Sequence, residues 1–186
     1  MEKLKIGVIV GSLRKGSYTR KIAQTLIGLA PSSVSMEIVE IGDLAIFNQD
    51  FDDEGNTPKE WTSFREHMSK FDAVLFATPE YNRSFPAAIK NALDIGSRPY
   101  GASVWTGKPG AVISVSPGML GGFGSNQHLR QPLAFLGVPV MQQPEAFIGN
   151  AASLFDDKGV LTNQKSREFL QKYMDAFLLW IAKIKD

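Results

Sequence analysis

The stretch Gly7-Val-Ile-Val-Gly-Ser-Leu-Arg-Lys-Gly-Ser17 decides the fold, because it joins a strand pattern to a helix pattern through a glycine-rich loop. The apolar run ending at Val10 is typical of a buried strand, which we predict over residues 3–10. After the loop, apolar residues recur on one helical face, at Ile22, Ala23, Leu26 and Ile27. The N-terminal part of the chain therefore predicts one strand–loop–helix unit.

The same order continues through the rest of the chain. Further apolar runs predict strands over residues 36–41, 72–78, 110–116 and 138–141. Helical spacing predicts helices over residues 57–71, 84–95, 125–135 and 162–184. The helix over 57–71 begins with a Thr57 N-cap, Pro58 and Glu60. This alternation predicts the α/β class: a three-layer α/β/α sandwich around a five-stranded parallel sheet.

Composition excludes several kinds of site and partner. The 186 residues contain no cysteine and two histidines, which rules out disulfides, thiolate metal sites, thiol nucleophiles and paired-histidine metal motifs. A net charge of +1 without a basic stripe argues against nucleic-acid binding. No apolar run approaches the roughly 18 residues of a membrane span, and no signal-peptide pattern opens the chain. We expect one cytoplasmic domain over residues 1–186, with no membrane or nucleic-acid partner.

Three predicted loops follow the carboxyl ends of strands and carry unusual residues: 11–17, 79–84 and 117–124. Ligands of open parallel sheets bind beyond these strand ends, where the strand order reverses. In the order 2-1-3-4-5, the first, third and fourth strands are neighbours. The three loops are therefore expected to line one crevice.

The first loop favours an anion. Backbone N–H groups at a helix N-terminus attract negative charge, and Ser12, Arg14, Ser17 and Thr19 add donors. Ser17 stands where a nucleoside-triphosphate loop requires lysine, and no dinucleotide fingerprint follows the first strand. A phosphatase-like loop would need a cysteine. These exclusions leave a phosphate monoester as the predicted ligand, which the loop binds without a nucleophilic attack on the phosphorus.

The other two loops favour a flat ring. Pro79-Glu-Tyr-Asn82 can offer backbone groups and packing side chains to a heterocycle. Residues 117–124 hold four glycines, which allow close backbone approach, and they precede a helix N-terminus whose donors favour negative charge. Ordinary turn chemistry explains either loop alone, but together with the phosphate loop they indicate a mononucleotide with a planar ring.

The motifs also carry a family resemblance. They are Gly11–Ser17, Thr78–Asn82 with Pro86 and Lys90-Asn91 downstream, and Gly107-Lys-Pro with the Ser116 loop. Over about residues 3–150 this combination resembles the bacterial NAD(P)H-dependent FMN reductases of flavodoxin-like fold, particularly the soluble quinone and chromate reductases.

The resemblance implies tightly bound, non-covalent FMN, NAD(P)H as co-substrate, quinones, chromate or similar small-molecule acceptors, and a homodimer or homotetramer with the flavin near the subunit interface. It implies cofactor contacts from Gly11, Ser12, Leu13, Arg14, Lys15, Gly16, Ser17, Tyr18, Thr19, Pro79, Glu80, Tyr81, Asn82, Ser116, Gly118 and Gly121. Two positions depart from the family pattern: Thr19 replaces a frequent asparagine, and Arg83 replaces a frequent aromatic residue.

Substrate contacts are expected from Asn82, Arg98 and Gly122. We hypothesise that Arg98 attracts anionic acceptors or nicotinamide phosphates; a surface salt bridge is the alternative. Tyr100 and Trp105, in the same connection, are expected to pack on a partner subunit and partly cover the flavin.

No catalytic side chain is predicted, because the cofactor carries the hydride chemistry and the protein supplies position and electrostatics. A chain of this length has no room for a separate nicotinamide domain, so we expect NAD(P)H and acceptor to alternate in a ping-pong mechanism. The alternatives are a flavodoxin-like electron carrier, against which the net charge of +1 argues, and a binding protein that has lost turnover.

Overall fold

The computed structural model describes residues 3–185, so positions 1, 2 and 186 of the predicted domain lie outside the described residues. Five strands form one parallel sheet in the order β2-β1-β3-β4-β5, as predicted. The strands are β1 (Leu4–Val10), β2 (Val34–Val39), β3 (Ala73–Pro79), β4 (Gly110–Val115) and β5 (Ala146–Ile148). The helices are α1 (Tyr18–Leu29), α2 (Asp50–Asp53), α3 (Lys59–Ser69), α4 (Ala87–Gly96), α5 (Phe123–Phe135) and α6 (Gln164–Lys185), with a 3-10 turn at Ala151–Leu154.

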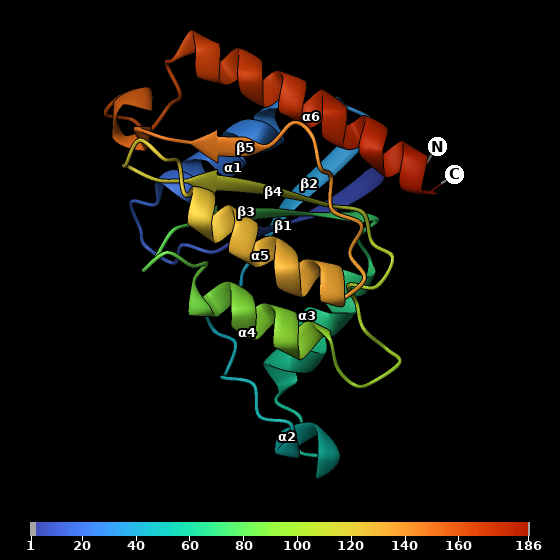
Figure 1. The fold of residues 1–186 in the computed structure, drawn as a ribbon. Helices are drawn as coiled ribbons and strands as arrows, with labels where there is room; N and C mark the ends of the chain where they lie inside the picture. The colour runs from blue at the N-terminus through green and yellow to red at the C-terminus, as the bar shows by residue number, and fades with distance from the viewer. Residues whose placement is uncertain (1–2, 186) are drawn as a thin grey trace.

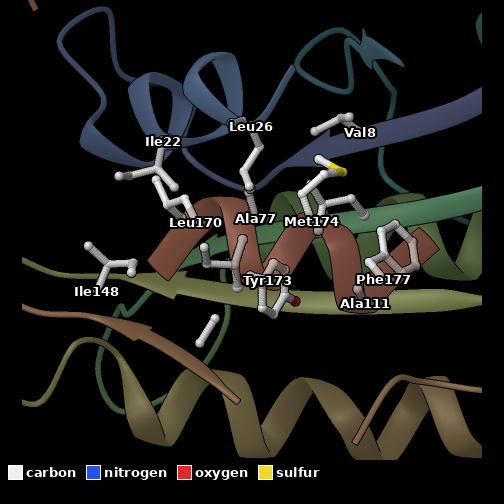
Figure 2. Close-up of a cluster of buried hydrophobic side chains, with 14 of the residues drawn as sticks. Val8, Ile22, Leu26, Ala77, Ala111, Ile148, Leu170, Tyr173, Met174 and Phe177 are labelled. Atoms are coloured by element: carbon white, nitrogen blue, oxygen red, sulfur yellow. The ribbon is translucent and has the colours of Figure 1, made fainter. Parts of the chain in front are cut away.

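Helices cover both faces of the sheet, which makes three layers (Figure 1). On one face, α1 and α6 pack against alternate strand residues; Figure 2 shows Leu26 and Phe177 meeting Ala77 and Ala111 there. On the other face, α3, α4 and α5 pack against the intervening residues, such as Phe76. β3 and β4 are buried along their whole length. This burial on both faces explains why their sequences are continuous apolar runs.

Two local predictions are wrong. The predicted fifth strand at 138–141 makes only one bridge, between Val140 and Gly110, and the strand itself forms at Ala146–Ile148. Pro139 has no N–H to donate to a ladder, which limits pairing there. At the start of α3, the Thr57 hydroxyl donates to Asp52 at 2.8 Å instead of capping the helix, and Pro58 occupies the N-cap.

The apolar stripes of the helices lie where the sequence predicts them. Trp61, Phe64 and Met68 of α3 are buried in the core. Within residues 3–185, no helix is long and apolar enough to cross a membrane.

Candidate active site

The loops after β1, β3 and β4 all emerge at the carboxyl edge of the sheet (Figure 1). The first two are in direct contact: the Ser12 hydroxyl lies 3.5 Å from the Tyr81 hydroxyl. A Cβ on Gly11 would come within 2.6 Å of Ile89 and 3.1 Å of the Pro79 ring. The lack of a side chain at Gly11 therefore lets these two loops pack against each other.

The first loop presents a row of unpartnered donors. Within the described chain, no protein group accepts from the backbone N–H of residues 12–16, 18 or 19. The Ser17 hydroxyl caps α1 by accepting from the Arg20 N–H at 3.1 Å. Ser12 and Thr19 are almost fully buried, whereas Arg14 and Lys15 are exposed. Open N–H groups at a helix N-terminus beside hydroxyls and cations are the donor set that a phosphate monoester requires.

The two cations of the first loop, Arg14 and Lys15, take part in no ion pair within the described residues. Arg20, just beyond it, forms a bidentate pair with Glu40 at 2.7 and 2.8 Å, and these hydrogen bonds lower the pKa of the Glu40 carboxyl. The charge of Arg14 and Lys15 is therefore open to a bound anion.

The second loop contains a tight turn with strained backbone. Tyr81 and Ser84 exchange two backbone hydrogen bonds, at 2.9 and 3.0 Å, and the residues between them, Asn82 and Arg83, have positive φ values of 52° and 67°. Positive φ values are unfavourable for residues with side chains, and residues held in such conformations cluster at ligand sites. The Ser84 hydroxyl, 2.8 Å from His128 Nδ1, ties the turn to α5. The turn leaves Tyr81 43% exposed at the edge of the sheet.

The Glu80 carboxylate is held at the N-terminus of α5, where the third loop ends. Its Oε2 atom accepts from the Ser125 N–H at 3.1 Å, in the first turn of α5, and Arg83 lies 3.8 Å from the other oxygen. The prediction that the α5 N-terminus is open to ligand charge is therefore corrected. A carboxylate of the chain itself already occupies part of that positive end.

The third loop depends on glycine at two positions. Gly121 and Gly122 have φ values of +62° and +79°, and a Cβ on Gly121 would lie 2.6 Å from the backbone of Phe147. The Ser116 hydroxyl accepts from the Gly118 N–H at 3.1 Å and shapes the start of the loop. Exposed apolar side chains border the loops at this edge, namely Leu13, Tyr81, Met119, Leu120 and Phe123. This apolar rim fits a flat aromatic ligand.

The sequence comparisons agree with this geometry. Residues 4–153 match the family described as NADPH-dependent FMN reductase. The chain belongs to this family. It is 58% identical over 176 residues to a quinone reductase of Pseudomonas putida, covering 95% of this chain and 94% of that protein. It is 43% identical over 178 residues to a 2-hydroxy-1,4-benzoquinone reductase of Burkholderia sp, covering 96% of both.

A solved structure extends the match to three dimensions. FerB of Paracoccus denitrificans, a flavoenzyme NAD(P)H:(acceptor) oxidoreductase, superposes with a TM-score of 0.89 at 40% identity. The match covers 96% of this chain and 97% of FerB. The chain is therefore an FMN-dependent oxidoreductase of the reductase family, with the flavodoxin-like architecture that the motifs imply.

Arg98 does not join the loops of this FMN reductase within one chain. It follows the carboxyl end of α4, whereas the Pro79–Ser84 loop lies at the amino end, about 15 Å away along ten residues of helix. Arg98 bonds Ser97 at 3.0 Å and stacks on Tyr100, 3.9 Å from the ring centroid. Within one chain Arg98 makes local contacts at the opposite edge of the sheet, and its role in binding substrates stays a prediction.

Trp105 is likewise displaced from its predicted surface position. The side chain is fully buried, its indole N–H donates to the Leu93 carbonyl at 3.0 Å, and its ring packs against Phe64 and Phe76. It therefore cannot cover a flavin or dock on a partner subunit. Tyr100 remains 78% exposed.

Two buried hydroxyls next to the second loop escaped sequence reasoning. Thr78 and Ser125 are fully buried beneath Pro79. Thr78 looks like an ordinary strand residue and Ser125 like an ordinary residue of a first helical turn. No local pattern signals that they meet, because 47 positions separate them in the chain.

Proposed function

We propose that this protein is an FMN-dependent NAD(P)H:quinone oxidoreductase. The observation that carries the proposal is the meeting of three loops at one sheet edge, one with open N–H groups and cations, the others with an apolar rim. The Pseudomonas putida and Burkholderia relatives support quinones as the acceptor class. Because these relatives are named as reductases, they argue against the alternative function of a flavodoxin-like electron carrier.

The phosphate of FMN is assigned to the first loop, residues 11–19. Its open N–H groups donate to the phosphate oxygens, the Ser12, Ser17 and Thr19 hydroxyls add donors, and Arg14 and Lys15 supply positive charge. Tyr18 stands at the first position of α1, beside these donors. The +0.5 charge equivalent at the amino end of such a helix favours the same group.

The ring of FMN is assigned to the second and third loops. Pro79, Glu80, Tyr81 and Asn82 of the second loop and Ser116, Gly118 and Gly121 of the third loop would hold it. Asn82 and Gly122 contact the substrates. When bound, FMN would supply the redox chemistry, namely hydride acceptance from NAD(P)H and electron transfer to the acceptor.

The protein's own contribution is to orient the reactants and exclude water. The apolar rim of Leu13, Tyr81, Met119, Leu120 and Phe123 favours flat, partly apolar molecules such as nicotinamide and quinone rings. Because one ring position serves both substrates, we expect ping-pong kinetics. Chromate is a further acceptor in this proposal.

The exposed rim also supports the proposal of a homodimer or homotetramer, since a monomer rarely leaves such apolar residues together in water. We also propose that the protein works in the cytoplasm. Sedimentation at micromolar concentration tests the first proposal, and a monomer with full activity would contradict it.

One experiment tests the function directly. The purified protein is expected to carry flavin absorbance, to bleach rapidly on anaerobic addition of NADPH or NADH, and to regain colour on addition of a quinone. Parallel initial-rate lines would fit ping-pong kinetics. A colourless protein that takes up no added FMN, or a yellow protein that bleaches only with a separate reductase, would contradict the proposal.

A further inference from the structure

The turn at the tip of the second loop carries an arginine at a position that favours glycine. Tyr81 and Ser84 form an antiparallel bridge. The two residues between them, Asn82 and Arg83, have φ values of +52° and +67°. Positive φ at both central residues is the pattern of a type I′ turn, for which Asn-Gly is a preferred pair. Asn82 matches this preference, whereas the Cβ atom of Arg83 makes its positive φ unfavourable.

The Arg83 side chain adds little to the stability of the fold. It is 82% exposed, and its ionic contact within the described residues, to Glu80 Oε1, is 3.8 Å long. An exposed pair of this length contributes little. The Glu80 side chain is only 17% exposed and accepts from the Ser125 N–H at 3.1 Å, so it is held without the arginine. Folding therefore does not account for an arginine at this strained position, and strain of this kind points to a function.

Arg83 lies at the rim of the site to which the ring of FMN is assigned. On one side of the turn, the Tyr81 hydroxyl lies 3.5 Å from the Ser12 hydroxyl of the first loop. On the other side, a Cβ on Gly124, the last residue of the third loop, would lie 3.1 Å from the Arg83 carbonyl oxygen. The turn therefore stands where the three loops meet, and its exposed guanidinium is open to a ligand that enters there.

The charges of the three loops leave one cation unassigned. Arg14 and Lys15 of the first loop are assigned to the phosphate of FMN. Arg83 is the only lysine or arginine of the second and third loops, residues 79–84 and 117–124. A nicotinamide dinucleotide must bring its ring to the flavin ring, so its own phosphate groups lie outside the ring site. Because the first loop is filled by FMN, the Arg83 guanidinium is the loop cation that remains for these phosphates.

We propose that Arg83 binds the phosphate groups of the nicotinamide dinucleotide and sets the affinity for this hydride donor. The inference rests on the proposed function. A guanidinium binds two phosphate oxygens at once. The turn that carries it is tied to α5 by the contact between Ser84 and His128 at 2.8 Å, so its backbone is fixed before the donor binds. The pyrophosphate is common to NADH and NADPH, whereas the 2′-phosphate belongs to NADPH alone.

The test compares four variants with the wild-type holoenzyme. Arg83→Gln removes the charge, Arg83→Gly removes the side chain and relieves the turn, and Arg83→Lys keeps a charge without the planar fork. Lys172→Gln removes an exposed cation from α6, on the other face of the sheet, and controls for net charge. The hydride donors are NADPH, NADH and 1-benzyl-1,4-dihydronicotinamide, which has the reacting ring and no phosphate.

Anaerobic stopped-flow reduction gives the Kd of each dinucleotide and the limiting rate of flavin reduction. In Arg83→Gln and Arg83→Gly the Kd for NADPH is expected to rise about tenfold. The limiting rate, the Kd for FMN and the rate with the phosphate-free donor are expected to stay unchanged. Arg83→Lys is expected to lie between these variants and the wild type, and Lys172→Gln to match the wild type.

Two further readouts sharpen the assignment. A larger rise of Kd for NADPH than for NADH would assign the guanidinium to the 2′-phosphate, and an equal rise would assign it to the pyrophosphate. In urea denaturation, the midpoint of Arg83→Gly is expected to equal or exceed that of the wild type, because glycine relieves the positive φ. Stability and donor affinity would then change in opposite directions or independently, which a structural role does not produce.

The possible results separate the two proposals. An unchanged Kd for both dinucleotides in Arg83→Gln and Arg83→Gly would overturn the role of Arg83. Slower reduction by the phosphate-free donor, weaker FMN binding or a lower urea midpoint in Arg83→Gly would indicate a structural role and overturn it too. If the wild type and Lys172→Gln bind no FMN, or bind FMN that none of the donors reduces, the proposed function itself fails.

Discussion

The two edges of the sheet carry long, polar, glycine-containing connections that resemble each other in sequence and differ in structure. At the carboxyl edge, the backbone N–H groups of residues 12–16 have no acceptor in the described chain. At the amino edge, the connection 97–109 is closed: Val104 and Gly107 donate to backbone carbonyls, and the Lys108 ammonium donates to Met68 at 2.9 Å and to Phe71. Exposed N–H groups without a protein acceptor are open to water or to a ligand. The carboxyl edge is therefore the edge at which we propose that FMN binds, whereas the amino edge is closed by the chain's own contacts.

The largest effect is expected at the amino edge, from Trp105→Ala. The indole is fully buried and a Cβ on Gly96 would lie 2.6 Å from it, so the truncation leaves a large cavity. Stability is expected to fall by about 4 kcal/mol in chemical denaturation. The FMN affinity of the folded protein is expected to stay unchanged. Tyr100→Ala, at an exposed neighbour, is the control, and a loss of FMN affinity in folded Trp105→Ala would break the division between the edges.

Gly121→Ala, at the carboxyl edge, is expected to reduce stability less than Trp105→Ala does. It is also expected to weaken FMN binding. The new Cβ would meet the Phe147 backbone at 2.6 Å, with φ at +62°. We expect a stability loss of about 2 kcal/mol and weaker FMN binding by calorimetry. Gly28→Ala, in α1 with open space around it, is expected to be neutral or slightly stabilising. Equal FMN affinity in Gly121→Ala and wild type would count against the third loop as a ring contact.

The Asp52–Arg65 ion pair predicts how the free energy of unfolding depends on pH. Arg65 bonds both Asp52 oxygens, at 2.8 and 2.6 Å, and also the Ile95 carbonyl at the end of α4, and these hydrogen bonds lower the pKa of Asp52. A carboxyl whose pKa is lowered on folding stabilises the protein above its unfolded pKa of about 3.9. That contribution disappears as the pH falls through the lower folded value.

Asp52→Asn is therefore expected to cost about 1.5 kcal/mol at neutral pH, and the difference from wild type is expected to shrink steadily below about pH 4. Urea denaturation across the pH range measures it. A difference that stays constant down to the most acidic pH would contradict a role for the ionised pair. FMN affinity at neutral pH is expected to be the same in both proteins.

The smallest and most selective effect is expected from Ser17→Asp. Aspartate caps a helix as well as serine, so stability is expected to be retained. Its charge, at the position that now accepts from the Arg20 N–H, would repel a phosphate. We expect FMN binding about tenfold weaker than in Ser17→Asn, the neutral cap of equal size. Equal FMN affinities of Ser17→Asp and Ser17→Asn would contradict the assignment of the phosphate to the first loop.

Sequence reasoning was most successful where a local pattern has one physical meaning. Continuous apolar runs predicted β1, β3 and β4, and a glycine-rich loop between strand and helix predicted the open N–H groups of residues 12–16. The prediction of the fifth strand at 138–141 is wrong, because an apolar run of this length does not distinguish a strand from a loop, and the strand forms at residues 146–148. Sequence reasoning also failed at Trp105, because an aromatic residue in a loop can face the core or the solvent, and only its neighbours decide.

The sequence by itself determined the alternation of strands and helices, because burial periodicity acts locally. The strand order that brings the three loops to one edge is what the resemblance to flavodoxin-like FMN reductases implied. Only the tertiary structure decided where polar groups find their partners. Glu80 turns to Ser125, 45 positions away, and Arg98 lies at the far end of α4. Such pairings depend on which distant segments pack together, and no local pattern of residues encodes them.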